Sequence, residues 1–150
     1  MSGLFLSGYA SLFGQRDGAG DIIRPGAFKG SLARRGARGI AMLWQHDPSA
    51  PIGIWTHMAE DRRGLKVRGR LLPGVARGRE AAALVAAGAL TGLSIGFRAL
   101  KARRQSDGRG RGGHSRILFD IDLWEVSLVT FPQVDGARVR LLTGPSGRPS

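Results

Sequence analysis

The chain contains no cysteine and only three histidines among its 150 residues. The absence of cysteine excludes disulfide bonds, thiol catalysis and zinc sites with cysteine ligands. Three histidines leave little for a histidine-based metal site, so we expect neither a metal ion nor another cofactor. No run of residues approaches the roughly eighteen apolar positions that a membrane-spanning helix requires. Residues 1–6 also lack the features of a secretory signal, so we expect a cytoplasmic protein without membrane association.

Acidic residues are few as well: 11 Asp and Glu stand against 23 Lys and Arg, which gives a net charge of +12. Such an excess favours binding to polyanions, nucleic acid above all. Arginine outnumbers lysine by twenty to three, however, and with 24 glycines this composition also fits the coding bias of a GC-rich genome. The basic residues gather in residues 34–38, 62–63 and 103–116. A solvated surface and a polyanion site both stay open.

The length suits one domain with a single core, which we predict at residues 1–142, followed by a disordered Gly/Pro/Ser tail at residues 143–150. Helices are predicted at residues 25–35 and 76–89, and a polar, glycine-rich loop at residues 102–115. Strand character is found in residues 4–13, 39–45, 52–57, 64–72, 93–101, 116–130 and 137–142. This order, without regular βαβ alternation, predicts a mainly β (α+β) fold: a small closed or nearly closed β-barrel flanked by helices.

Three apolar, strand-like segments each contain one potentially reactive side chain: His46, Ser94 and Glu125. An unpaired polar group in such a segment is costly, so each side chain needs a partner. A serine hydroxyl becomes a useful nucleophile when an imidazole takes its proton and a third group orients that imidazole. Ser94 therefore matches a nucleophile, His46 a base and Glu125 an acid.

Each candidate also has a plainer role that the residues alone leave open. His46 precedes Asp47 and Pro48, as turn residues often do, and Ser94 could be a hydrogen-bonded core serine. The pattern Gly-x-Ser-x-Gly around Ser94 matches the nucleophile elbow of α/β-hydrolases, but the order of elements is wrong, because a strand and not a helix follows the serine. His57 beside a turn and His114 among glycines and arginines are expected to be structural and solvated, respectively.

The acid has three candidates in one strand-like segment. In the segment 116–130, period-two alternation places Glu125 on the face of Leu123 and Ser127, and Asp120 and Asp122 on the opposite face. A carboxylate among aliphatic side chains points towards the core or a cleft, which favours Glu125. A register error of one residue would exchange it for Asp120 or Asp122, so these alternatives stay open.

Six segments carry a family resemblance: residues 8–13 (Gly-Tyr-Ala-Ser-Leu-Phe), 21–28 (Asp-Ile-Ile-Arg-Pro-Gly-Ala-Phe), 43–47 (Leu-Trp-Gln-His-Asp), 51–53 (Pro-Ile-Gly), 90–97 (Leu-Thr-Gly-Leu-Ser-Ile-Gly-Phe) and 123–132 (Leu-Trp-Glu-Val-Ser-Leu-Val-Thr-Phe-Pro). In this order and at this spacing they resemble the prohead maturation proteases of HK97-type tailed phages. Related proteins occur in prophages and gene transfer agents. The match covers residues 8–135 and is highly specific.

The resemblance implies a serine endopeptidase that works inside an immature capsid in the bacterial cytoplasm. It implies cleavage of the major capsid protein or a scaffold segment, followed by self-cleavage, and a fold similar to that of herpesvirus assembly proteases. His46 matches the family's Gln-His-Asp histidine and Ser94 its Leu-Ser-Ile-Gly serine, while Glu125 lies in Glu-Val-Ser-Leu. The alternative is a non-catalytic capsid-associated or polyanion-binding protein that uses the basic segments. Homo-oligomers and a secondary role for nucleic acid stay open.

Overall fold

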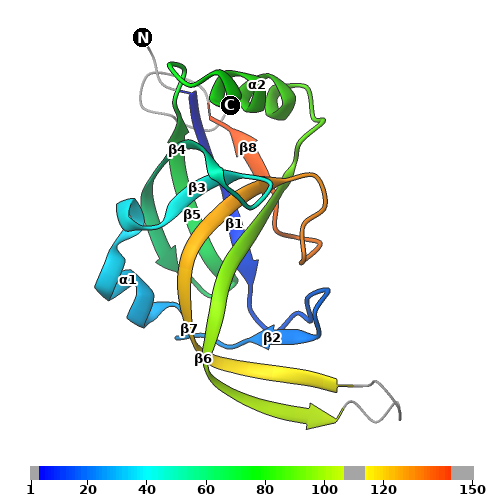
Figure 1. Ribbon diagram of the computed structural model, residues 1–150. Coiled ribbons are helices and arrows are strands. Elements are labelled where there is room, and N and C mark those ends of the chain that lie inside the picture. The colour runs from blue at the N-terminus through cyan, green and yellow to red at the C-terminus, as the bar shows by residue number, and fades with distance from the viewer. Residues whose placement is uncertain (1–3, 107–113, 143–150) are drawn as a thin grey trace.

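The computed structural model describes residues 4–106 and 114–142, which fold mainly into β-strands (Figure 1). A short 3-10 turn, η1 (Ala37–Gly39), follows the first of the two described helices, α1 (Lys29–Arg35) and α2 (Ala76–Ala86). The strands are β1 (Leu4–Leu12), β2 (Asp21–Ile23), β3 (Ala41–Trp44), β4 (Asp47–Glu60), β5 (Gly64–Leu71), β6 (Gly92–Ser106), β7 (His114–Val129) and β8 (Val139–Leu141).

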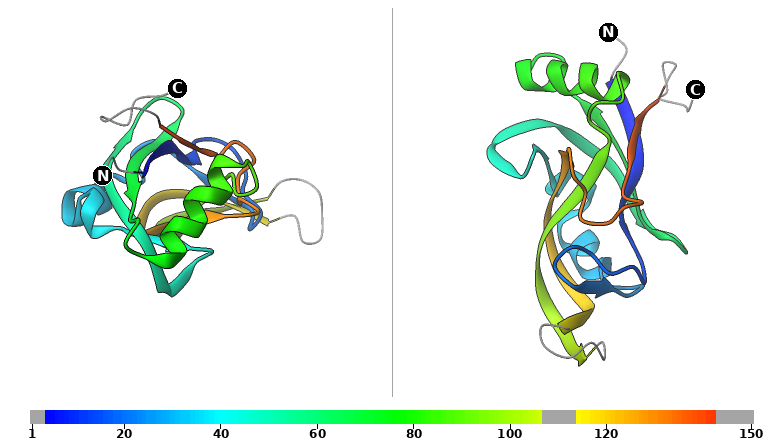
Figure 2. Two further views of the ribbon diagram at one scale, coloured as in Figure 1. Left: turned by 90° about the horizontal axis from the view of Figure 1, so that it is seen from above. Right: turned by 90° about the vertical axis from the view of Figure 1, so that its right-hand side faces the viewer.

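All described strands belong to one sheet that curls into a nearly closed barrel, as the view from above shows (Figure 2). The order is β2-β7-β3-β4-β5-β1-β8, and β6 also pairs with β7. β7 is therefore shared: it runs parallel to β2 and β3 and antiparallel to β6. A bridge between Gly92, the first residue of β6, and Arg138, which precedes β8, brings these two parts of the sheet together. The predicted fold class, a nearly closed barrel flanked by helices, is confirmed.

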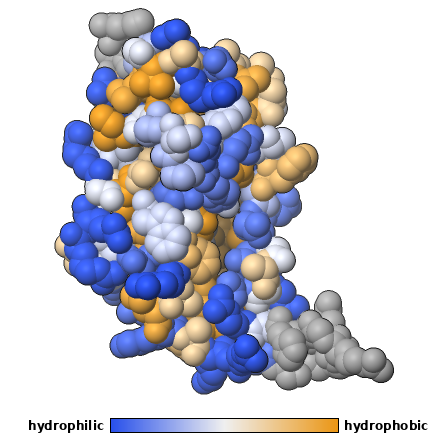
Figure 3. Space-filling model, in the orientation of Figure 1, coloured by the Kyte–Doolittle hydropathy of each residue, from blue (hydrophilic) through white to orange (hydrophobic). Residues whose placement is uncertain are grey.

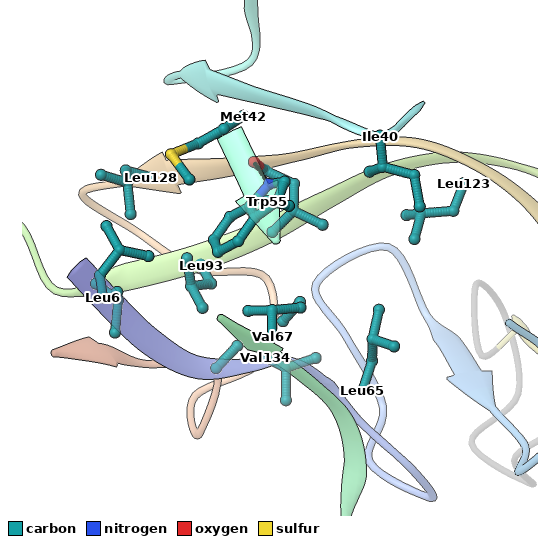
Figure 4. Packing of buried hydrophobic residues seen from close by; sticks show 14 of the residues in the cluster. Leu6, Ile40, Met42, Trp55, Leu65, Val67, Leu93, Leu123, Leu128 and Val134 are labelled. Atoms are coloured by element: carbon teal, nitrogen blue, oxygen red, sulfur yellow. Dashed lines mark hydrogen bonds between the residues drawn. The ribbon is translucent and has the colours of Figure 1, made fainter. Parts of the chain in front are cut away.

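The core lies inside the curl of the sheet and is centred on Trp55 of β4, which is fully buried. Figure 4 shows its ring among Leu93, Leu128 and Met42, contributed by β6, β7 and β3. Trp55 Nε1 donates a hydrogen bond of 3.1 Å to the Val126 carbonyl, which satisfies the one polar atom of the ring. Packing and this hydrogen bond together fix β4 against β7.

Both predicted helices are present with altered bounds: α2 begins at Ala76 as predicted but ends at Ala86 instead of residue 89. α1 begins at Lys29 instead of residue 25, because the preceding residues form turns. The Glu60 carboxylate accepts hydrogen bonds from the Gly26 and Phe28 N–H groups, at 2.7 and 2.9 Å, and so satisfies donors ahead of the helix. Gly36 follows α1 with a φ of 65°, as expected for a glycine that ends a helix.

The predicted loop at residues 102–115 is wrong at both ends. Residues 102–106 continue β6 and pair with residues 114–118 of β7, which forms a two-stranded arm that extends beyond the barrel (Figure 1). Residues 102–105 on the β6 strand of this arm are all exposed, so polar side chains are tolerated there and periodicity gives no signal. The remainder of that loop, and the predicted tail at residues 143–150, lie outside the described residues.

Sequence analysis missed β2, which is only three residues long, and the first five residues of β4, which include two prolines and two polar side chains. Among the described residues, no helix is long and apolar enough to cross a membrane. Hydrophilic side chains cover most of the face seen in Figure 3, with apolar patches between them.

Replacement of the central core side chain is expected to destabilise the protein strongly. We expect Trp55→Ala to lower the free energy of unfolding by about 3–5 kcal/mol, because it removes a fully buried ring and leaves a cavity. Phe131→Ala is the matched control, since Phe131 is 86% exposed, and its effect is expected to stay within about 0.5 kcal/mol. Urea unfolding of both variants measures the difference; equal effects would contradict the assigned core.

Candidate active site

His46 lies in the two-residue turn that joins β3 to β4. Trp44 pairs with Asp47 across this turn, and Gln45 and His46 have φ values of 51° and 62°. Two central residues with positive φ are the requirement of a type I′ hairpin turn. Residues other than glycine adopt this conformation at a cost, and such strain is typical of functional sites. His46 is therefore a turn residue, which is the plainer of its two sequence-based roles.

Hydrogen bonds of Gln45 hold this turn against the end of β7. Its backbone N–H donates to the Leu128 carbonyl at 2.9 Å. Its side-chain amide donates to the Thr130 hydroxyl at 2.8 Å and accepts from the Thr130 N–H at 3.2 Å. These three hydrogen bonds hold the backbone of the adjacent His46 in place.

The antiparallel pairing of β6 and β7 positions the other two candidates. Ser94 lies directly opposite Ser127, and Gly96 lies directly opposite Glu125. A Cβ atom on Gly96 would fall 2.4 Å from Glu125 Oε2. The Glu125 carboxyl group thus occupies the space that any other residue at position 96 would fill, which explains the glycine in this strand.

The three side chains meet in one hydrogen-bonded chain. Ser94 Oγ lies 3.0 Å from His46 Nε2, and His46 Nδ1 lies 2.5 Å from Glu125 Oε2. Ser94 and Glu125 are buried, whereas the His46 side chain is 41% exposed. Because the carboxylate accepts a hydrogen bond from Nδ1–H, Nε2 is left as the acceptor for the serine hydroxyl. This is the arrangement in which imidazole can act as a general base.

Glu125 also changes the proton affinity of the imidazole. Its hydrogen bond to His46 raises the pKa of that histidine above the ordinary value of 6.5, against the opposing effect of partial burial, and its negative charge adds to the rise. The carboxylate thus stabilises the imidazolium that forms when a proton is taken up.

Ser127 is a fourth member of this group that sequence analysis missed. Its hydroxyl donates to Glu125 Oε1 at 2.6 Å and accepts from the His46 backbone N–H at 3.1 Å. Ser127 is fully buried and joins the carboxylate to the histidine turn. Its place on the same predicted strand face as Glu125 was the available signal.

The alternative acids lie elsewhere. Asp122 is on the outside of β7, where it forms an ion pair with Arg35 at 3.0 Å that lowers the pKa of the aspartate. Asp120 lies on the side of β7 that faces α1, near Gly30. Neither contacts His46. His57 is exposed on β4 and bonds to its neighbour Thr56.

A small cavity of about 20 Å³ lies beside Ser94. It has room for about one water molecule. Gln15, Asp17 and Gln133, from the segments after β1 and β7, contribute to its wall. In the described part of the chain, no three His, Asp or Glu residues are grouped as a metal site would require.

The sequence matches the family model described as caudovirus prohead serine protease over residues 2–145. The prohead protease of Enterobacteria phage HK97 is 38% identical over 147 residues, which cover 97% of this chain and 62% of that protein. The chain thus spans about three fifths of the length of this relative.

Solved structures show the same fold at low sequence identity. The capsid assembly protease of bacteriophage T4 superposes with a TM-score of 0.66 at 17% identity, covering 87% of this chain and 84% of the other. The varicella-zoster virus protease gives a TM-score of 0.57 at 18% identity, covering 91% and 62%. The barrel is therefore shared with phage and herpesvirus proteases.

We expect Gly96→Ala to lower the pKa of His46, because the added methyl group displaces the Glu125 carboxylate from Nδ1. An NMR titration of the imidazole measures this, with the His46 signals assigned by their loss in His46→Gln. Gly74→Ala is the control, since a Cβ at Gly74 meets nothing within 4 Å. An unchanged pKa of His46 in Gly96→Ala would contradict the packing of the carboxylate against Gly96.

Proposed function

The chain belongs to the caudovirus prohead serine protease family, and we propose that it is a serine endopeptidase that processes capsid or scaffold protein during the maturation of a phage-like particle. The single observation that carries this proposal is the hydrogen-bonded chain from Ser94 through His46 to Glu125. Ser94 lies 48 residues after His46 in the sequence and Glu125 lies 79 residues after it. Ser94 Oγ is nevertheless 3.0 Å from His46 Nε2, and Glu125 Oε2 is 2.5 Å from His46 Nδ1.

The proposed mechanism follows from these contacts. Ser94 Oγ attacks the scissile carbonyl carbon while His46 Nε2 takes the hydroxyl proton. His46 then gives this proton to the leaving amine, and an acyl-enzyme remains on Ser94. A water molecule, deprotonated by the same imidazole, attacks the ester carbonyl carbon. The ester bond to Ser94 Oγ then breaks, His46 returns the proton to this oxygen, and the new carboxyl terminus is released. Glu125 orients His46 and stabilises its cation, and Ser127 orients Glu125.

The space beside Ser94 is small. The cavity there holds about 20 Å³, and the segments that carry Gln15, Asp17 and Gln133 form its wall. We propose that these segments shift when a peptide enters. Both segments are loops, which move more readily than the strands that carry Ser94 and Glu125.

The same proposal covers the partners and the place of action. The substrate is the major capsid protein or a scaffold segment, and self-cleavage follows within the immature capsid in the host cytoplasm. Confinement in a shell raises the concentration of protease and substrate, which favours weak association, including that of homo-oligomers.

Removal of the nucleophile tests the reaction class. We expect Ser94→Ala to slow cleavage of the cognate capsid or scaffold protein by about 10³-fold or more, because the attacking oxygen is lost. Gel electrophoresis of timed reactions measures the rate, and circular dichroism confirms folding. Ser49→Ala, which removes an exposed hydroxyl bonded to Asp47, is the control and is expected to retain the wild-type rate. Wild-type cleavage by Ser94→Ala would overturn the assignment.

The pH profile tests the base. His46 must be neutral to accept the serine proton, and Glu125 raises its pKa. The rate is therefore expected to rise with pH, with a midpoint above 6.5, the ordinary pKa of histidine. Glu125→Gln is expected to lower both the plateau and this midpoint, since the stabilising carboxylate charge is gone. If the midpoint of the pH profile were the same in Glu125→Gln as in the wild type, the proposed pairing of His46 with Glu125 would be contradicted.

A further inference from the structure

A second feature lies on the outer face of the barrel, over β1 and β5. The exposed Lys66 and half-buried Arg68 alternate on β5 with side chains that face the core. In the antiparallel register, Lys66 lies opposite Tyr9 of β1 and Arg68 lies opposite Ser7. Both cationic residues therefore border β1 from one side.

On the other side of β1, a second pair of cationic residues lies on β8 and immediately before it. Arg140 lies opposite Ser7, and Arg138 is two residues away on the same exposed face of the chain. Figure 2 shows β8 beside β1 along the edge of the barrel. A small side chain on β1 thus lies between long cationic side chains on both neighbouring strands, and this difference in side-chain length forms a depression.

Two adjoining cavities of about 360 and 280 Å³ occupy this depression, and Ser7, Lys66 and Arg140 line both. We name the combined depression the cationic trough. Among the described residues, no carboxylate lines either cavity. Its cationic lining residues are Arg63, Lys66, Arg68, Arg138 and Arg140.

Two carboxylates lie beside residues of the trough, against its five cationic side chains. Asp61 accepts a hydrogen bond from the Tyr9 hydroxyl, and Asp135 forms an ion pair with Arg138 at 3.2 Å. Both lie outside the lining of the trough. The trough therefore presents an excess of positive charge that attracts an anionic partner.

The shape of the trough favours an extended polypeptide. Its walls stand on β5 and β8, two strand spacings apart, or about 10 Å. An extended peptide fits that width, and guanidinium groups bind carboxylates through paired hydrogen bonds. Single-stranded nucleic acid relies on exposed aromatic rings for stacking. Tyr9 and His57 supply the aromatic rings of the trough. Arg63 and Lys66 already contact the Tyr9 ring, each 4.9 Å from its centroid, and the His57 imidazole is hydrogen-bonded to Thr56.

The trough is connected to the surroundings of Ser94. Arg138 lines both the trough and a groove of about 660 Å³ around residues 130–138. This groove in turn shares Asp17 and Gln133 with the cavity beside Ser94. The trough and the cavity beside Ser94 are therefore linked by shared lining residues through this groove.

From this arrangement we infer that the cationic trough binds an acidic, extended segment of the polypeptide substrate, away from the bond that is cut. The inference rests on the proposed function, since it places both contacts on one substrate chain. Tethering by the trough raises the effective concentration of the scissile segment near Ser94. It also selects substrates that carry an acidic stretch.

A binding experiment tests the trough without catalysis. The probe is a fluorescent oligo-glutamate peptide, titrated by anisotropy into full-length Ser94→Ala protein, with oligo-glutamine and single-stranded oligothymidylate as comparison ligands. The trough variant is Lys66→Gln with Arg140→Gln. The matched control, Lys101→Gln with Arg104→Gln, removes one lysine and one arginine from exposed positions of β6. We expect the trough variant to weaken oligo-glutamate binding about tenfold and the control less than twofold.

Equal weakening by both variants would show attraction by net charge alone and overturn the inference. Tighter, trough-dependent binding of oligothymidylate would overturn it as well, in favour of nucleic acid. The two proposals fail separately. Ser94-dependent cleavage without trough-dependent binding overturns only the inference, and trough-dependent binding without cleavage by the wild-type protein overturns only the proposed function.

Discussion

The buried carboxylate of Glu125 is the constraint on which the site depends. A charged group that is only 4% exposed is costly unless each oxygen is hydrogen-bonded. His46 satisfies one oxygen and Ser127 the other. These two partners come from the β3–β4 turn and from β7 itself, so the same contacts that stabilise the charge also fix the histidine over Ser94. Gly96 supplies the space in which the carboxyl group lies.

The barrel makes this arrangement rigid. β7 pairs with β2, β3 and β6. Its residues Glu125 and Ser127 lie opposite Gly96 and Ser94 of β6, respectively. The site therefore lies on paired strands, which hold side chains more accurately than loops do. The strained turn at Gln45 and His46 is held to the end of β7 by Gln45 and Thr130. Local strain persists there because the surrounding hydrogen bonds over-determine the backbone.

Charged residues are grouped in the fold differently from their grouping along the sequence. Arg34 and Arg35 pair with Asp122 on the outside of β7, so part of that basic segment is neutralised. Lys66 and Arg140 are far apart in sequence and lie in none of the basic segments of the chain, yet β1 brings them to one trough. The family fold thus places a candidate catalytic centre and a candidate recognition surface on connected faces of one barrel.

Alternating hydrophobicity, the Ala-rich helix and three short motifs determined the fold class and singled out His46, Ser94 and Glu125, because side-chain periodicity and residue chemistry are local properties of the chain. Tertiary structure alone decided that Glu125, and neither Asp120 nor Asp122, reaches His46. It alone decided that Ser127 joins the group, that residues 102–106 are strand, and that the cationic trough exists. Each of these depends on strand register and on contacts between distant segments, and a sequence read along its length contains neither.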